Sequence, residues 1–427
     1  MLRFLYTLLL IFATPLVLLR LWLRGRREPG YRQHVSERFG DFSEPTLSGA
    51  IWIHAVSVGE ARAAAPIIAA LHARFGQRPI LITCMTATGR ATATELFGDV
   101  ARIVYLPYDF PWAHRNLFRR FDPCALLVME TEIWPNLLAG CLDKNIPALL
   151  VNARMSERSR AGYARFAPVR GLIREALQSM NQIAAQSAAD AQRFATLGAS
   201  NVAVTGNVKF DIEPSLDQVA LGKRWKAQIG SRRVLLAAST RDGEEVLITA
   251  AYKNVFDATA RRQTLLVIVP RHPQRFDDVF ALMVKAGLRV QRRSTVTESD
   301  AAVTEDTEVW LGDSMNEMFA YLALSDVAFV GGSLVPVGGH NLIEACALGK
   351  PVLMGPSTFN FAEAASAAVA AGAMIGVNDA EQLVLTAKEL LDNAERRAAM
   401  SVCALEFAAA HRGATEKTVN LISDLIE

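Results

Sequence analysis

The sequence predicts an α/β protein of two doubly wound halves, each a parallel sheet covered by helices, with an N-terminal membrane-anchor helix. Three observations lead to this prediction. Short apolar runs alternate with longer stretches of helical periodicity, the alternation forms two series separated by a polar stretch, and an apolar segment occupies residues 2–23. Repeated strand and helix units imply parallel sheets, because parallel strands need crossover connections.

Composition bounds the class of protein. Its 427 residues suit two or three domains, each large enough to bury a core. With 51% hydrophobic and 21% charged residues, the chain is not of the disordered class. The 45 basic and 43 acidic residues leave a net charge of +2, which gives no support to nucleic-acid binding by the whole protein. The mean hydropathy is positive, which favours a membrane segment.

Residues 1–30 are predicted to be a membrane anchor with a basic flank. Seventeen of the 22 positions from Leu2 to Leu23 are hydrophobic, and a helix of that length rises about 33 Å, roughly one hydrocarbon thickness. The uncharged part, residues 4–19, is shorter and contains Pro15, so a tilted or monotopic helix fits the pattern as well as a span. A cleaved signal peptide is the alternative, although no small-residue cleavage site follows.

The residues that flank the anchor indicate a cytoplasmic location for the rest of the chain. Basic residues cluster at the end of the segment, and the positive-inside rule places them in the cytoplasm. They are Arg20, Arg24, Arg26 and Arg27. The five cysteines are an odd number without a Cys-x-x-Cys pair, so neither a disulfide framework nor a structural zinc site is expected.

The first domain is expected at residues 31–210. Its apolar runs are typical of buried strands, and these are expected at residues 51–57, 79–85, 102–106, 125–130, 147–151, 182–186 and 202–205. Helical spacing separates them, for example at residues 60–74 and 136–144. A polar linker is expected at residues 211–231.

The second domain, expected at residues 232–427, repeats the pattern. Strands are expected at residues 234–238, 264–269, 326–330 and 351–354, with helices at residues 243–256, 274–286 and 341–348. Two such domains leave a cleft between them. Ligands of open α/β sheets bind outside the carboxyl ends of the strands, so the loops that follow the strands are where chemistry is expected.

Three common nucleotide signatures are missing. The chain has no G-x-G-x-x-G, no G-x-x-x-x-G-K-[ST] and no Asp-x-Asp pair. A conventional dinucleotide site or P-loop is therefore not expected, nor is a diphosphate bridged by magnesium.

Glu60 is the first candidate catalytic residue. It lies in the motif HAVSVGE at residues 54–60, where the first strand ends and a helix begins. Gly59 permits a ligand to approach closely, and a carboxylate at this place can take a proton from an attacking hydroxyl. The alternative is that Glu60 only complements the positive end of the helix.

Two further motifs of the first domain carry candidate supporting residues. METEIWPN at residues 129–136 places Glu130 and Glu132 at another strand end, where one of them can orient a base or accept sugar hydroxyls, or both can simply begin a helix. TGNVKFD at residues 205–211 contains Lys209, which can neutralise an anionic group or be an ordinary exposed lysine.

The second domain has the pattern of a site for a nucleotide with one or few phosphates. Arg271 and His272 follow a strand in the motif VPRHP. The motif GDSMNEM runs from a loop into a helix at residues 312–318, and four glycines occur within residues 331–339, just before Asn341. Glycines let backbone N–H groups approach an oxyanion, and Glu344 is placed to accept the hydroxyls of a ribose. The alternative is that these glycines only form tight turns.

As a set, these motifs resemble the 3-deoxy-D-manno-octulosonic acid (Kdo) transferase family of Gram-negative lipopolysaccharide synthesis. The likeness covers nearly the whole chain, and its motifs occur in the order expected for the family. They are SVGE at 57–60, METEIWPN at 129–136, NARMS at 152–156, TGNVKFD at 205–211, VPRHPQRF at 269–276, FVGGSLVPVGGHNLIEA at 329–345 and VLMGPSTFNF at 352–361.

The resemblance implies a GT-B fold, with an N-terminal acceptor-binding and a C-terminal CMP-sugar-binding Rossmann-like domain. It implies an inner-membrane protein whose catalytic domains face the cytoplasm. It also implies inverting, metal-independent transfer of Kdo from CMP-Kdo to lipid IVA, the lipid A precursor, without a cofactor.

The resemblance also assigns roles to residues. Glu60 would be the general base, supported by Lys209 and by Glu130 or Glu132. The residues that would hold CMP are Pro270, Arg271, Asn316, Glu317, Met318, Asn341, Leu342, Ile343 and Glu344. One departure is Asn316, where some members have glycine; it affects what can be expected of the detailed backbone contact to the nucleotide, but not the loop itself.

The acceptor side is expected in the first domain. A basic stretch overlaps and follows NARMS, and it can bind lipid phosphates or form a solvated helix face. It consists of Arg154, Arg158, Arg160, Arg165, Arg170 and Arg174. Two other functions share parts of the pattern: a nucleotide-sugar epimerase of the GT-B type, which needs no lipid acceptor or anchor, and a non-catalytic membrane protein that binds lipid or nucleotide.

Overall fold

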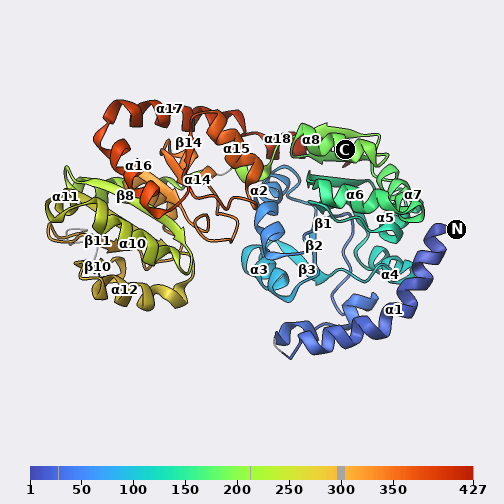
Figure 1. The fold of residues 1–427 in the computed structure, drawn as a ribbon. Helices are drawn as coiled ribbons and strands as arrows, with labels where there is room; N and C mark the ends of the chain where they lie inside the picture. Colours follow the sequence, from blue (N-terminus) through green and yellow to red (C-terminus); the bar gives the residue numbers. More distant parts are fainter. Residues whose placement is uncertain (27, 212, 296–302, 427) are drawn as a thin grey trace. The chain divides into compact units, whose positions relative to one another are not determined.

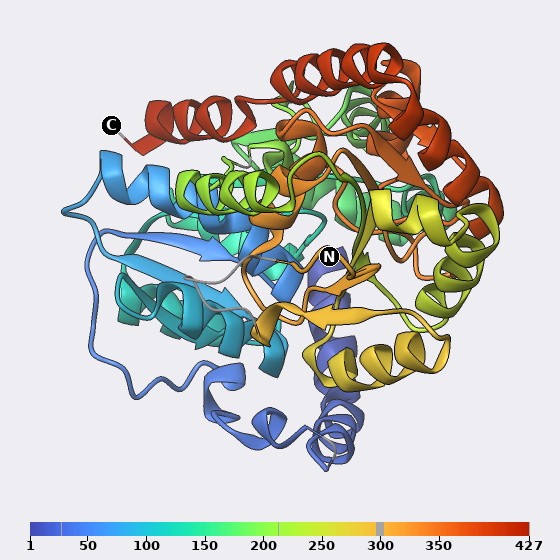
Figure 2. The same ribbon diagram turned by 90° about the vertical axis from the view of Figure 1, so that its left-hand side faces the viewer.

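The structure is a computed structural model that describes residues 1–26, 28–211, 213–295 and 303–426. The chain forms two compact units, one made of Met1–Asp211 and His411–Glu427 and the other of Ile212–Ala410. Within the described residues, each unit contains a parallel sheet of seven strands, and helices cover both faces of each sheet (Figure 1, Figure 2). The predicted fold class is confirmed.

The sheet of the first unit has the strand order β3-β2-β1-β4-β5-β6-β7. Its strands are β1 (Ala50–His54), β2 (Ile80–Cys84), β3 (Ala101–Tyr105), β4 (Pro123–Met129), β5 (Ala148–Ala153), β6 (Gln182–Ala185) and β7 (Val202–Val204). Its helices are α1 (Leu2–Arg24), α2 (Val58–Arg74), α3 (Ala87–Phe97), α4 (Pro111–Phe121), α5 (Pro135–Asp143), α6 (Glu157–Arg165), α7 (Ala167–Gln178), α8 (Ala188–Thr196) and α18 (Ala414–Ile426), with the short 3₁₀ helices η1 (Pro29–Arg32), η2 (Ser36–Phe39) and η3 (Val208–Phe210).

Both faces of this sheet are buried, which explains why its strands are continuous apolar runs. In β1, Ile51 and Ile53 pack into the core under α2 and α3, whereas Trp52 points to the opposite core with Phe118 and Leu137. The order of the strands reverses between β1 and β4. The loops that follow these two strands therefore meet at the topological switch point, where open α/β sheets bind ligands.

The sheet of the second unit has the strand order β10-β11-β9-β8-β12-β13-β14. Its strands are β8 (Arg233–Thr240), β9 (Thr264–Pro270), β10 (Val290–Arg292), β11 (Val309–Leu311), β12 (Val327–Val330), β13 (Val352–Met354) and β14 (Met374–Gly376). Its helices are α9 (Leu216–Ile229), α10 (Glu244–Val255), α11 (Ala258–Gln263), α12 (Phe276–Lys285), α13 (Met318–Leu324), α14 (Ile343–Ala347), α15 (Ala362–Ala370), α16 (Ala380–Asp392) and α17 (Ala394–Ala410), with the 3₁₀ helices η4 (Pro273–Arg275) and η5 (Arg293–Thr295). Here the switch point lies between β8 and β12.

The structure differs from the expected organisation between the two series. Most of the stretch expected as a linker forms α9, which packs on α13. Gly222 makes this packing possible, because a β-carbon there would overlap the carbonyl group of Ala320. The indole of Trp225 packs edge-on against Trp310, with ring centroids 5.0 Å apart.

The end of the chain returns to the first unit. Asp211 receives the backbone N–H of Gly413 on Oδ1 at 2.6 Å, and α18 packs against α2. Val419 and Ile422 are buried in the same core as β1. Residues 411–426, expected with the second domain, thus complete the core of the first unit.

Candidate active site

Glu60 is held at the end of β1 by a reciprocal pair of hydrogen bonds. Ser57 is the N-cap of α2, its Oγ accepts the Glu60 N–H at 3.5 Å, and its hydroxyl donates to Glu60 Oε1 at 3.0 Å. Oε2 of Glu60 accepts the N–H of Val56 at 2.8 Å. This capping arrangement folds the side chain back over the β1–α2 loop and fixes its carboxylate at the switch point of the sheet.

The surroundings of Glu60 favour its protonated form. Burial raises the pKa of Glu60 to about 7, and the negative charges of Glu130 and Glu132 act in the same direction. The hydrogen bonds from Val56 and Ser57 oppose this rise, because they stabilise the charged carboxylate. A carboxylate whose pKa is near neutral can accept a proton from a hydroxyl and release it again at the same pH.

Glu130 pairs with two cations directly after β4. Its backbone is left-handed, with φ 59°. Oε1 lies 3.3 Å from Nζ of Lys209, and Oε2 lies 3.8 Å from Nε of Arg154. Lys209 belongs to η3, whose first turn is capped by Asn207 Oδ1. Three segments far apart in sequence thus bring Glu60, Glu130 and Lys209 into one electrostatic group.

Glu132 has a different partner. Its Oε2 accepts the indole N–H of Trp134 at 3.0 Å. Burial raises the pKa of Glu132, with a further contribution from the charge of Glu130. The sequence left the two glutamates equivalent, whereas the structure pairs Glu130 with cations and Glu132 with an indole.

In the second unit, the residues expected to hold CMP follow three strands at the same edge of the sheet. Pro270 ends β9, and Arg271 comes directly after it. Residues 316–318 follow β11 and lead into α13, and residues 341–344 follow β12 and lead into α14. Because β11, β9, β8 and β12 are consecutive in the sheet, their loops lie side by side.

Glu344 and Arg271 are electrostatic neighbours. Burial raises the pKa of Glu344, and the hydrogen bond from Asn341 Nδ2, 3.2 Å long, and the charge of Arg271 oppose the rise. Leu342 and Ile343 are fully buried, so this segment offers a ligand its backbone and the side chains of Asn341 and Glu344.

The loop after β11 explains the departure at Asn316. This residue has φ 60°, in the left-handed region that favours glycine and that asparagine tolerates best among the larger residues. Its carbonyl accepts a hydrogen bond from Gln218 Nε2 at 2.6 Å. Glu317 is held by Arg293 at 3.0 Å and by the Ser314 hydroxyl at 2.5 Å. The loop keeps its left-handed backbone although a side chain replaces the glycine hydrogen.

Sequence reasoning missed Glu244, which holds the glycine-rich loop after β12. This fully buried carboxylate accepts four backbone N–H groups at 2.7–3.0 Å, and they belong to Arg241, Gly332, Ser333 and Leu334. Three of these donors lie about ninety positions away in the sequence. The motif STRDGEE at residues 239–245 directly after β8 was the available signal.

Arg241 was also missed. It directly follows β8, and its guanidinium contacts the ring of His272. Burial and, in the same direction, the positive charges of Arg271 and Arg241 lower the pKa of His340 to about 4. Within the described residues, neither Arg241 nor Arg271 has a carboxylate partner in an ion pair. Two acids near these arginines, Glu245 and Asp242, are bound by Arg275 instead. The strand ends thus present two guanidinium groups that make no ion pair, which suits an anionic ligand.

One group among the described residues has the spacing of a metal site, formed by His34, Glu37 and Glu44. Glu37 is already engaged there, since its Oε2 accepts Arg90 at 2.5 Å and the backbone N–H of Tyr105 at 2.7 Å. The arginine supplies the positive charge that a cation would bring. The group is better explained as a buried ion pair.

Comparison with known proteins agrees with this architecture. Residues 33–212 match the model of the 3-deoxy-D-manno-octulosonic-acid transferase (kdotransferase) family, and residues 264–405 match glycosyl transferases group 1. A glycosyltransferase structure from Rickettsia africae has a TM-score of 0.57 at 12% identity, covering 89% of this chain and 99% of its own, which shows a common GT-B fold.

Two full-length relatives are more informative. The 3-deoxy-D-manno-octulosonic acid transferase of Bordetella pertussis is 41% identical, and the alignment covers 99% of each chain. The protein of the same name from Haemophilus influenzae is 36% identical, covering 100% of this chain and 99% of its own. The chain is therefore a glycosyltransferase and belongs to the 3-deoxy-D-manno-octulosonic acid transferase family.

Proposed function

We propose that this glycosyltransferase moves Kdo from CMP-Kdo to lipid IVA in lipopolysaccharide synthesis, at the cytoplasmic face of the inner membrane. The names of its full-length relatives support Kdo as the group transferred. The apolar helix α1 supports attachment to a membrane. The first unit would bind the acceptor and the second the donor.

One observation carries the mechanism: a carboxylate with a pKa near neutral is fixed at the switch point of the first unit. We assign to Glu60 the role of general base. The acceptor hydroxyl would attack the anomeric carbon of Kdo from the face opposite the phosphate while Glu60 takes its proton. The bond from this carbon to the phosphate oxygen would break, and its electron pair would leave with CMP. A single displacement of this kind inverts the anomeric configuration.

Departure of CMP requires stabilisation of a phosphate dianion. Arg271 makes no ion pair among the described residues, and its charge acts on the neighbouring Glu344, which would accept the ribose hydroxyls. CMP has a single phosphate, so arginine and backbone N–H groups are sufficient for its charge, and the proposal requires no metal. Glu130 and Lys209 would position and polarise the acceptor side of the reaction.

The test is transfer from CMP-Kdo to lipid IVA, followed by the mass of the lipid product. Glu60→Gln is expected to lower kcat by at least about a hundredfold, whereas Glu95→Gln, at an exposed position of the same unit, should retain full activity. Near wild-type transfer by Glu60→Gln would refute the base assignment. Consumption of CMP-Kdo without a lipid acceptor, giving an altered sugar nucleotide, would instead indicate the epimerase.

A further inference from the structure

Helix α1 is long and apolar enough to cross a membrane, judged by length and composition. One side of it nevertheless packs on the first unit, where it contacts α5, α7 and η1. Partly or fully buried positions recur every three or four residues, which is the spacing of one helix face. They are Leu2, Arg3, Tyr6, Thr7, Leu10, Ala13, Thr14, Val17 and Leu21.

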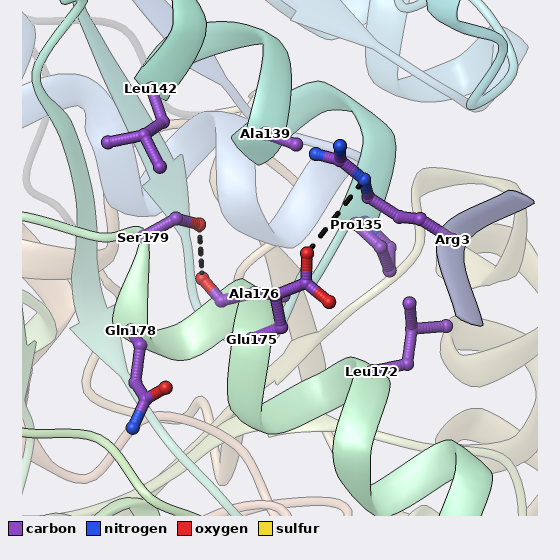
Figure 3. A pocket seen from close by; sticks show the side chains of 9 residues that line it. All are labelled: Arg3, Pro135, Ala139, Leu142, Leu172, Glu175, Ala176, Gln178 and Ser179. Atoms are coloured by element: carbon purple, nitrogen blue, oxygen red, sulfur yellow. Dashed lines mark hydrogen bonds and ion pairs between the residues drawn. The ribbon is translucent and has the colours of Figure 1, made fainter. Parts of the chain in front are cut away.

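Polar contacts fix the first half of α1 to the unit. Asn136 Nδ2 donates to Thr7 Oγ1 at 2.9 Å, and the Tyr6 hydroxyl lies near the buried Asp109, whose charge acts on it. Nε of Arg3 lies 3.9 Å from Oε1 of Glu175 on α7, and Figure 3 shows this pair reaching from α1 to α7. These partners come from the β3–α4 loop, α5 and α7, all parts of the catalytic unit.

The last turn of α1 is held by η1, the short helix that follows it in the sequence. Arg32 donates to the carbonyl of Trp22 at 3.2 Å, and the guanidinium of Arg24 lies 4.3 Å from the centre of the Tyr31 ring. From residue 3 to residue 24 the helix rises about 32 Å, roughly the full hydrocarbon thickness. If α1 crossed a bilayer, Asp109 and Asn136 would have to lie within hydrocarbon or lose these contacts, and both outcomes are costly.

The opposite side of α1 is an apolar surface. Its exposed large side chains are Phe4, Leu5, Leu8, Leu9, Ile11, Phe12, Leu16, Leu18, Leu19, Trp22 and Leu23. Leu142 is a further exposed leucine of this unit, on α5, and it lines a cavity of about 220 Å³ together with Arg3 of α1 and Glu175 of α7 (Figure 3). Arg20 and Arg26 are exposed near Trp22, and Arg26 stacks on its ring at 4.0 Å. Tryptophan beside arginines suits the level of anionic headgroups.

We propose that α1 lies in the plane of the membrane surface, with its apolar side in the acyl chains, and does not cross the bilayer. The N-terminus then stays on the same side as the catalytic units. This proposal rests on the membrane attachment in the proposed function. The partner of the apolar side is an anionic phospholipid bilayer, as the flanking arginines indicate.

Cysteine cross-linking in native membranes tests the position of α1. In a chain with Cys124 and Cys403 replaced by serine, Thr7→Cys with Asn136→Cys is expected to form a disulfide on mild oxidation. Phe12→Cys with Asn136→Cys, on the opposite side of α1, should not. Absence of the first cross-link, or equal yield from both pairs, would overturn the proposal.

Protease protection tests the topology. A tag before Met1 and a tag after Glu427 should both resist protease in spheroplasts and both be cleaved in inverted vesicles. Cleavage of the N-terminal tag alone in spheroplasts would show that α1 spans the membrane. Cleavage of the C-terminal tag in spheroplasts would instead contradict the cytoplasmic placement in the proposed function.

Flotation with phosphatidylglycerol vesicles tests the partner. Phe12→Asp should reduce the bound fraction of the full chain several-fold, and Leu385→Asp, at an exposed apolar position of the second unit, should not. If Phe12→Asp leaves flotation unchanged and halves the size of the protein in detergent, a second copy of the chain covers this side and the proposal is wrong.

Discussion

Replacing Glu60 by glutamine is expected to stabilise the protein at pH 8 while it lowers kcat by at least about a hundredfold. Because the pKa of Glu60 is raised from 4.5 to about 7, the native state keeps a proton that the unfolded chain has lost within this range. The free energy of unfolding therefore falls as the pH rises from 4.5 to 7. At 1.36 kcal/mol per pH unit, the charged carboxylate costs the native state about 3 kcal/mol above pH 7.

Glutamine is neutral at every pH, so Glu60→Gln removes this cost. The free energy of unfolding of the variant, relative to that of the wild type, should rise by about 3 kcal/mol between pH 4.5 and pH 8. The glutamine side chain loses one of the two hydrogen bonds that Ser57 and Val56 make to Glu60, which lowers the free energy of unfolding of the variant by about 1 kcal/mol at both pH values. The change in free energy between the two pH values is therefore unaffected.

Urea unfolding of the full chain in detergent, followed by tryptophan fluorescence, measures this difference. The comparison requires that the free energy of unfolding depends on urea concentration with the same slope in wild type and variant. Glu95→Gln is the matched control and should show no pH-dependent gain. If the effect of Glu60→Gln is the same at pH 4.5 and pH 8, the raised pKa of Glu60 is wrong, and with it the reason for naming this residue as the base.

Three further predictions test the charges and the packing around the two sites. Glu130→Gln should move the acidic limb of the pH profile of kcat to lower pH, because it removes a negative charge that raises the pKa of Glu60; an unmoved limb would contradict the coupling. Arg241→Ala should raise the KM for CMP-Kdo by about tenfold or more, and exposed Arg262→Ala should not; equal kinetics for both variants would exclude Arg241 from the donor site. Gly331→Ala would place a β-carbon 2.6 Å from a backbone oxygen of β8, so it should destabilise the protein by about 1–3 kcal/mol in urea unfolding and weaken CMP binding measured by titration.

The fold was predictable where strands are long and buried on both faces. The strands β4 and β9 have seven residues each, and nearly every position in them is buried. The missed strands β10, β11 and β14 have three residues each. Length alone does not explain the miss, because β7 and β13 are equally short and were expected. A three-residue strand shows little periodicity, and its pairing is decided by neighbours that are distant in sequence.

Helix α9 was missed for a different reason. Its sequence is polar enough to be expected as a linker, because only one narrow stripe with Gly222, Trp225 and Ile229 is buried. The sequence of α9 alone does not show that this stripe is buried, because its packing partner is α13, about a hundred residues later in the chain. In the same way, the return of α18 to the first unit depends on Asp211, whose carboxylate receives the N–H groups of Gly413 and Thr415 some two hundred positions later.

The residues of the candidate sites also differ in whether local sequence or distant partners determine their role. Glu60, Glu130 and Arg271 could be named from the sequence because each lies within a few residues of the end of an apolar run, and the end of a parallel strand is where a ligand meets the sheet. Glu244 and Arg241 also follow such a run, but their importance comes from partners. The carboxylate of Glu244 matters because four N–H groups converge on it, and Arg241 matters because β8 lies between β9 and β12. A sequence motif can identify residues that lie at the ends of strands. Which of these residues are neighbours depends on the order of the strands, and that order is a property of the folded sheet.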